Sequence, residues 1–239
     1  MTSWKTLLVA SAASLAFGGA ALAAEPAAPS FAFNAAYGSD YVFRGLSQTF
    51  GKGAASGGVD MTFGSFYVGN WDSTVDFGAP KQQFEFDLYG GYRAMLGPVA
   101  IDLGGVYYGY TAQPTGSNQA YYEGKVLASY AMGPNTLGGA FYYSPEFFGK
   151  TGAAEYYEIN DAFTLSNKVT VSGAVGYQAL DKTKVGISGY TTWNIGATYP
   201  ITDHFSIDFR YVGTDGKMTT FAGSSIAGDR LVASLKASF

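Results

Sequence analysis

The 239-residue sequence contains no cysteine, and histidine occurs once, at His204. A chain without cysteine forms neither disulfides nor Cys-ligated zinc sites, and a single histidine excludes a multi-histidine metal centre. Charged residues make up only 13% of the sequence, about half the usual share of a soluble domain. The net charge of −4 shows no basic excess, which argues against nucleic-acid binding. We therefore expect no cofactor, no metal and no nucleic-acid partner.

Long apolar runs are missing beyond the N-terminus, so no segment provides the roughly 20 apolar residues that a membrane-spanning helix needs. The N-terminus itself has Lys5, an apolar stretch over residues 7–20 and the sequence Ala21-Leu22-Ala23. This order of a charged region, an apolar region and a small-residue cleavage site is typical of a secretory signal peptide. We predict that residues 1–23 are cleaved and that residues 24–239 form one exported domain.

Glycine (33 residues), tyrosine (19) and phenylalanine (18) are abundant, and apolar residues alternate with polar ones through the mature chain. Alternation with period two is typical of β-strands with one polar and one apolar face. It is clearest at the C-terminus, where Leu231, Leu235 and Phe239 share one face. We count twelve strands, with 10 to 14 as the range that the pattern allows. The predicted spans are 31–47, 54–64, 66–76, 82–95, 99–111, 119–132, 135–144, 154–166, 169–180, 189–200, 205–214 and 228–239.

The connections between these strands alternate between short and long. The short ones fall near residues 64, 97, 133, 167 and 203, and longer polar stretches lie between them. Outer-membrane barrels have this alternation, with brief periplasmic turns and longer extracellular loops. The predicted fold class is therefore all-β: an antiparallel transmembrane β-barrel, most simply of 12 strands. Such a protein resides as an integral protein in the outer membrane of a Gram-negative cell.

A soluble β-sandwich is the main alternative fold, because it also has alternating strands. The interior of a twelve-stranded barrel is wide, since diameter grows with strand number, and side chains of this size would leave it unfilled. Turning the apolar face to lipid and the polar face to an aqueous lumen satisfies both faces, and closure pairs every backbone group. The membrane barrel is therefore favoured.

Several segments resemble one known family. The stretch Ser39-Asp40-Tyr41-Val42-Phe43-Arg44-Gly45-Leu46-Ser47-Gln48 resembles the opening motif of the TorF family, porin-like outer-membrane proteins of proteobacteria. Gly69-Asn70-Trp71-Asp72-Ser73, the strand from Glu85 to Tyr92 and Tyr121-Tyr122-Glu123 resemble later segments of that family. The terminal Phe239 resembles the signal by which the barrel-assembly machinery recognises its clients. The resemblance implies a porin-like barrel without an assigned substrate.

The polar strand faces predict a charged lumen with nine acids and six bases, and this excess of acids predicts weak cation preference. Glu85, Glu123 and Glu158 form an acidic wall in this scheme, and Arg44 and Arg230 a basic wall opposite, so that a transverse field orients dipolar solutes. The alternative is a solvated wall of ion pairs without solute preference. The lumen-lining candidates are Asp40, Arg44, Asp72, Glu85, Asp87, Glu123, Glu158, Asp208, Arg210 and Arg230.

The function predicted from these features is a porin-like channel for passive diffusion of small hydrophilic solutes. Its expected partners are outer-membrane lipid and lipopolysaccharide, the barrel-assembly machinery and the solutes themselves. A closed or plugged structural barrel is one alternative. A lipid-modifying enzyme barrel is disfavoured, because His204, the only histidine that could act as a base, falls in a predicted short periplasmic turn. We predict no catalytic residues.

Overall fold

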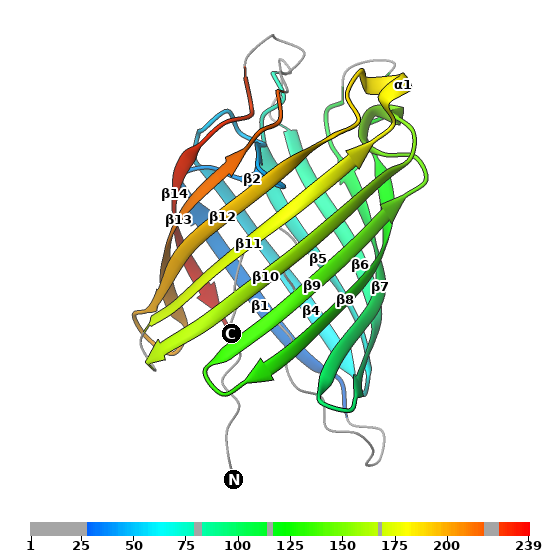
Figure 1. Ribbon diagram of the computed structural model, residues 1–239. Helices are drawn as coiled ribbons and strands as arrows, with labels where there is room; N and C mark the ends of the chain where they lie inside the picture. The colour runs from blue at the N-terminus through cyan, green and yellow to red at the C-terminus, as the bar shows by residue number, and fades with distance from the viewer. Residues whose placement is uncertain (1–27, 79–82, 114–116, 167–168, 218–224) are drawn as a thin grey trace.

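The computed structural model describes residues 28–78, 83–113, 117–166, 169–217 and 225–239. The predicted signal peptide, residues 1–23, lies outside the described residues. Figure 1 shows long, tilted strands that surround a central space. The elements are β1 (Ser30–Gly38), β2 (Val42–Phe43), β3 (Leu46–Ser47), β4 (Ala54–Phe63), β5 (Phe66–Val75), β6 (Gln83–Leu96), β7 (Val99–Tyr110), β8 (Tyr121–Met132), β9 (Asn135–Ser144), the 3-10 helix η1 (Phe148–Lys150), β10 (Ala154–Ser166), β11 (Val169–Leu180), the helix α1 (Lys182–Val185), β12 (Gly189–Pro200), β13 (Phe205–Thr214) and β14 (Arg230–Ser238).

Twelve strands form a closed antiparallel barrel, in which each strand pairs with its neighbours in sequence and β14 returns to pair with β1. The first barrel pairing, β1 with β4, skips β2 and β3, which form a separate two-stranded sheet. At the seam, the backbone amide of Phe239 donates to the carbonyl of Phe33 and the amide of Phe33 donates back, at 2.9 and 3.0 Å. Closure therefore leaves no free sheet edge. The predicted fold class is confirmed.

The two ends of the barrel differ as the connection lengths predict. We call them the turn end and the loop end. At the turn end, tight connections such as those at Gly64 and Gly133 have a backbone φ of 61° and 62°, which glycine adopts without strain. The short α1 and η1 lie in loop-end connections, as does the hairpin of β2 and β3 (Figure 1). No helix among the described residues is long and apolar enough to cross a membrane.

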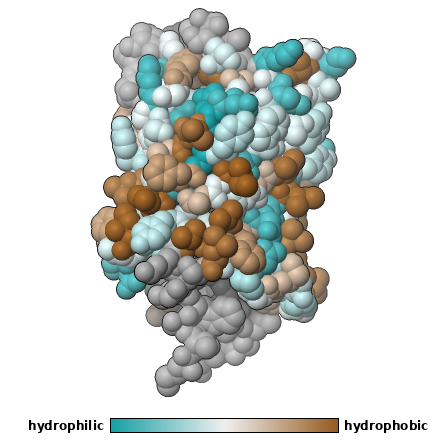
Figure 2. All heavy atoms as spheres, turned by 60° about the vertical axis from the view of Figure 1, so that its left-hand side comes forward, coloured by the Kyte–Doolittle hydropathy of each residue, from teal (hydrophilic) through white to brown (hydrophobic). Residues whose placement is uncertain are grey.

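The barrel is apolar outside and polar inside. Leu231, Ile159 and Phe31 are 80, 69 and 60% exposed on the outer face. Charged and amide side chains face inward, and Asp102 and Gln178 are fully buried. Figure 2 shows hydrophobic residues gathered across the middle of the visible wall. This polarity is the reverse of that in a soluble domain.

The structure corrects the first predicted strand. Residues 31–47 were expected to form one wall strand, but β1 ends at Gly38 and the chain then turns into the barrel. Arg44 and Gly45 have left-handed φ angles of 45° and 79°, which reverse the chain in a two-residue turn between β2 and β3. Alternation alone does not distinguish a wall strand from a hairpin folded inside the wall. The other eleven spans agree with the observed strands to within two residues at each end.

Candidate functional site in the barrel lumen

The segment 39–53, which we call the inward hairpin segment, crosses the lumen. It leaves the wall between β1 and β4, where Gly38 pairs directly with Ala54. In the ring of strands, β9 lies opposite β1. Arg44 at the hairpin tip reaches Glu123 on β8 and Gln178 on β11, so the hairpin spans from one wall to the other. A Cβ on Gly45 would lie 2.6 Å from the Oγ1 of Thr192 on β12, which shows how closely the tip approaches that wall.

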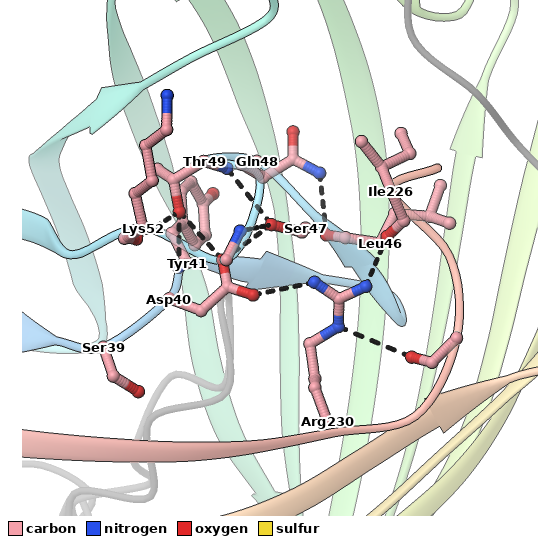
Figure 3. Close-up of polar contacts among 12 residues, drawn as sticks. Ser39, Asp40, Tyr41, Leu46, Ser47, Gln48, Thr49, Lys52, Ile226 and Arg230 are labelled. Carbon is pink, nitrogen blue, oxygen red and sulfur yellow. Dashed lines mark hydrogen bonds and ion pairs between the residues drawn. The ribbon is translucent and has the colours of Figure 1, made fainter. Parts of the chain in front are cut away.

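The base of the hairpin is held by Asp40 (Figure 3). One carboxylate oxygen of Asp40 accepts hydrogen bonds from the hydroxyls of Ser47 and Thr49, at 2.7 and 2.8 Å. The other accepts from the guanidinium of Arg230 at 2.8 Å. Arg230 also donates to the carbonyl of Ile226, so the same side chain connects the hairpin base to the chain before β14. Asp40 therefore determines where the segment leaves the wall.

The side chain of Arg44 is buried at the hairpin tip. It donates two hydrogen bonds to the carboxylate of Glu123, at 2.9 and 2.6 Å, and a third to the amide oxygen of Gln178 at 2.8 Å. Its central carbon lies 4.3 Å from the ring centroid of Tyr156 and 4.9 Å from that of Tyr142, distances typical of cation–π contacts. We call Glu123, Gln178, Tyr142 and Tyr156 the Arg44 box.

Aromatic side chains fill the lumen beside the Arg44 box, toward the loop end. Tyr108 and Tyr121 are stacked with centroids 4.4 Å apart, and Phe43 of the hairpin meets Tyr108 edge-on at 5.9 Å. Phe147 and Phe148, in the connection between β9 and β10, pack on Tyr121 at 4.7 and 6.4 Å. Sequence reasoning missed this cluster because it assigned tyrosine and phenylalanine to the lipid-facing belts. The signal available in the sequence was the position of Tyr108 and Tyr121 within their strands, because each alternates with the outward-facing residues and so points into the lumen.

Toward the turn end, the lumen charges form ion pairs between neighbouring strands. Asp102 on β7 lies 3.2 Å from Arg93 on β6 and 3.9 Å from Lys125 on β8, and it accepts a hydrogen bond from the hydroxyl of Tyr67 at 2.7 Å. On the opposite wall, Asp208 pairs with one base on its own strand, β13, and one on the neighbouring β14. There Asp208 lies 3.2 Å from Arg210 and 3.8 Å from Lys236. Each carboxylate therefore balances two bases within its own wall.

Some lumen acids have no basic partner. Within the described parts of the chain, the inward acids without a base within 4 Å are Asp60, Glu85, Asp87 and Glu158. Three of them accept hydrogen bonds from tyrosine hydroxyls: Asp60 from Tyr89, Glu85 from Tyr41 and Glu158 from Tyr156, each at 2.8 Å. Asp87 is 8% exposed, and one of its oxygens has no hydrogen-bond partner in the structure. The described lumen therefore has more inward carboxyl groups than bases.

The sequence-predicted lumen residues are nearly all inside. The prediction for Asp72 is wrong. This residue is exposed on the outer face of β5, where it accepts a hydrogen bond from Asn70 at 2.6 Å. The inward residues of β5 are its odd-numbered ones, such as Tyr67 and Trp71, so Asp72 has the opposite parity. The other nine candidates point into the barrel: Asp40, Arg44, Glu85, Asp87, Glu123, Glu158, Asp208, Arg210 and Arg230.

The expected transverse field is also corrected. Arg44 was placed on the wall strand at the seam, facing the acids across water. Because the hairpin carries it across the lumen, Arg44 instead contacts Glu123 directly, and Arg230 pairs with Asp40 near the seam. Glu85 and Glu158 do lie on the side of the barrel that includes β8, as expected. The acidic wall exists, but its central carboxylate is neutralised by the chain itself.

The turn end carries the only histidine. The ring of His204 stacks on Phe239 with centroids 5.1 Å apart, and its Nδ1 lies 2.9 Å from the carbonyl oxygen of Ser238. His204 thus packs on the terminal strand at the seam. No group of three or more metal-ligating side chains is assembled in the described residues.

The barrel resembles solved porin structures. The KdgM porin matches with a TM-score of 0.59 and 10% sequence identity, covering 87% of this chain and 99% of that one. The NanC porin matches with a TM-score of 0.57 and 10% identity, covering 88% and 99%. A structure of the KdgM porin in complex with disordered oligogalacturonate gives a TM-score of 0.58, 11% identity and coverage of 87% and 98%. At these identities the likeness shows the fold alone.

A search among curated proteins finds no match to this sequence. A family model does match, over residues 23–239, which is nearly the whole chain. Its description is a bacterial protein of unknown function. The chain therefore belongs to the Gcw_chp family.

Proposed function

We propose that the protein is an outer-membrane channel through which small hydrophilic solutes diffuse passively. The observation that carries the proposal is the reversed polarity of the closed barrel: apolar side chains cover the outside, and charged ones line the inside. Only a nonpolar solvent outside and a polar space inside suit that arrangement. The likeness to the KdgM and NanC porins supports the same architecture.

The barrel has the dimensions of a protein that spans a bilayer. Its wall strands are 9 to 14 residues long, near the roughly 9–11 residues that a tilted transmembrane strand needs. We place the turn end in the periplasm and the loop end outside a Gram-negative cell, after removal of residues 1–23. In this placement the exposed Phe239 is the signal for the barrel-assembly machinery, and lipid and lipopolysaccharide surround the wall. The likeness to the TorF family fits this hypothesis.

We further propose that the open channel weakly prefers cations. All six inward-facing bases of the described chain lie beside a carboxylate, whereas Asp60, Glu85, Asp87 and Glu158 lack a basic partner. Inward carboxyl groups without a basic partner thus outnumber unpaired bases, which favours cations over anions. A pore for anionic oligosaccharides would need free arginine or lysine side chains along the lumen, and each of the bases here is already paired.

A second candidate function is favoured by the inward hairpin segment. Because the hairpin spans the lumen from β1 to the Arg44 box, the barrel in this conformation is obstructed toward its loop end. A permanently closed barrel with a structural role would have this appearance. The proposal as a channel requires either residual passage beside the hairpin or its displacement.

A planar-bilayer experiment separates the two functions. The purified barrel is compared with a variant in which residues 39–53 are replaced by Asn-Gly, a two-residue turn that joins Gly38 to its partner Ala54. Steps of current from the natural chain, with a reversal potential that indicates cation preference, support the channel. Current from the shortened variant alone supports the closed barrel. If neither folded protein carries current, the proposed channel function is contradicted.

A further inference from the structure

We propose that the Arg44 box is a binding site for solutes that carry a guanidinium or ammonium group, and that Arg44 occupies it as a competitor built into the chain. This inference rests on the proposed function, because solutes reach the box only through the lumen. It names the class of solute that the channel would retain and the residue that keeps the site filled.

The polar side of the box is arranged to accept hydrogen bonds from a planar cation. The carboxylate of Glu123 presents two oxygens to the guanidinium, and the hydroxyl of Tyr108 donates to one of them at 3.1 Å. The amide nitrogen of Gln178 donates to the carbonyls of Glu155 and Ala179, at 3.1 and 3.2 Å. These bonds leave the amide oxygen of Gln178 directed at the cation. The acceptors are thus fixed by groups of the wall, independently of Arg44.

The aromatic side of the box also belongs to the wall. Tyr142 on β9 and Tyr156 on β10 pair across adjacent strands, with ring centroids 6.3 Å apart, and both approach the guanidinium. A cation beside a tyrosine face is stabilised by about 0.5–2 kcal/mol, depending on how far it is desolvated. Only Phe43, at 4.7 Å from the guanidinium carbon, arrives with the hairpin. A carboxylate, an amide oxygen and two rings therefore remain when Arg44 leaves.

The hairpin is held at its base and its tip but weakly between them. Each of its strands has two residues, and an isolated two-stranded hairpin is marginally stable in water. In the described structure, the backbone of residues 42–46 has no hydrogen bond to a wall strand; the pairs Val42–Ser47 and Phe43–Leu46 lie within the hairpin, and Ser47 donates its backbone amide to the carbonyl of Ile226 at 2.9 Å. The contacts of Arg44 therefore supply the polar attachment of the tip to the far wall, beside the edge-on packing of Phe43 on Tyr108.

An ion pair such as Arg44–Glu123 is a suitable contact to exchange. Burying both charges costs several kcal/mol of hydration for each ion, so a buried pair contributes little net stability compared with its hydrated partners. If the tip swings away from the wall, Arg44 regains water while an incoming cation takes its place beside Glu123. Asp40 and Arg230 at the hairpin base are not disturbed by this exchange.

Neighbouring acids favour delivery of a cation to the box. Asp87 on β6 and Glu158 on β10 lie on either side of Glu123 in the ring, at comparable distances from the turn ends of their strands. Neither has a basic partner in the described chain. Where these carboxyl groups are ionised, they favour the approach of a cation at this height of the lumen.

The test uses Arg44→Asn, because asparagine followed by glycine is the preferred pair for a two-residue hairpin turn of this kind. The variant keeps the hairpin and removes its cation. Block of the K⁺ current by methylguanidinium is measured in planar bilayers. We expect half-block of the Arg44→Asn channel at a concentration about tenfold lower than for the natural chain, the ratio that corresponds to about 1.4 kcal/mol. Equal block of the two channels would overturn the inference.

A second substitution tests the site itself. Adding Glu123→Gln to Arg44→Asn removes the carboxylate from the box and should abolish the gain in block. The matched control adds Glu155→Gln instead, which removes a neighbouring carboxylate on the outward face of the same wall, next to Tyr157. That control should leave the block unchanged. A gain that survives Glu123→Gln, or that Glu155→Gln also removes, contradicts the assignment.

Calorimetric titration of methylguanidinium into the detergent-solubilised barrel provides a readout that does not depend on conduction. Binding by the Arg44→Asn barrel without any current would reject the proposed channel and keep the site. Current without binding would reject the site and keep the channel. If Arg44→Asn does not fold, the variant with Asn-Gly in place of residues 39–53 replaces it, since all four residues of the box lie on wall strands.

Discussion

The two halves of the lumen are stabilised in different ways. Toward the turn end, charges pair within one wall, and the partners are close in sequence: Arg93 and Asp102 are 9 residues apart, and Asp208 and Arg210 are 2 apart. Toward the loop end, Arg44 meets residues 79 and 134 positions away. The wall cannot move its charges into water without opening the barrel, whereas the hairpin can. The same chemistry is therefore structural in one half and exchangeable in the other.

The largest effect is expected from Asp102→Asn in the turn half. The substitution removes the carboxylate beside Arg93 and Lys125, whose amine already has no hydrogen-bond partner in the structure. Loss of one partner from a buried ion pair costs about 3–5 kcal/mol, and the strands cannot relax. We expect the urea midpoint for unfolding in lipid vesicles to fall accordingly. Asp203→Asn in an exposed turn is the control, and an equal shift for both would contradict the comparison.

Glu123→Gln should cost less, although it removes the carboxylate of the Arg44 pair. The hairpin can leave the wall and return Arg44 to water, so we expect a loss of global stability of no more than about 1–2 kcal/mol. The mobility of the inward hairpin segment should rise instead. Leu46 is 9% exposed, and Leu46→Cys gives a single thiol in a chain without cysteine. Maleimide should label that thiol several-fold faster when Glu123→Gln is present.

A fixed hairpin would give the opposite result for Glu123→Gln. Unchanged labelling together with a loss of stability as large as that of Asp102→Asn would show that the hairpin is as rigid as the wall. The comparison between the two halves would then fail, and with it the exchange of Arg44 for a solute cation.

The same contrast explains what the sequence could predict. Period-two alternation located eleven wall strands and the inward parity of Glu85, Asp87 and Asp208, because each depends on residues two positions apart. Residues 39–47 follow the first strand directly in sequence, so the hairpin was interpreted as the end of that strand. The position of the hairpin inside the barrel depends on contacts with β8 and β11, and a pattern of neighbouring residues in the sequence does not reveal such distant contacts. Asp72 was placed inside because it is charged, but it shares the outward face of β5 with Phe66 and Val68.

Two tyrosine hydroxyls make a matched pair across the two halves. Tyr67 donates to Asp102 in the turn half, and Tyr41 donates to Glu85 from the hairpin, at 2.7 and 2.8 Å. Phenylalanine at either position keeps the ring and removes one hydrogen bond to a carboxylate, worth about 1.5–3 kcal/mol in a rigid setting. Urea unfolding should show that full loss for Tyr67→Phe and a smaller loss for Tyr41→Phe. Equal losses would show that the hairpin unfolds only with the barrel.

The smallest effect concerns the ion pair at the outer margin of the hairpin. Lys52 donates to Asp76 at 2.9 Å, and this hydrogen bond lowers the pKa of Asp76, helped by the backbone amide of Gly78. Because the pKa is lower in the folded state, the contribution is present above the ordinary pKa of an aspartate and is lost as the pH falls through the folded value. Lys52 is largely exposed, so the pair is worth no more than about 0.5 kcal/mol. Because the thiolate is the reactive form, labelling of the Leu46→Cys variant is divided by that of its urea-unfolded chain at the same pH. This ratio should therefore change little between pH 7 and pH 5 and rise slightly below pH 4, and Lys52→Met should remove that rise. A larger increase that persists in Lys52→Met would place the acid-sensitive contact deeper in the lumen, at the wall carboxylates rather than at the hairpin margin.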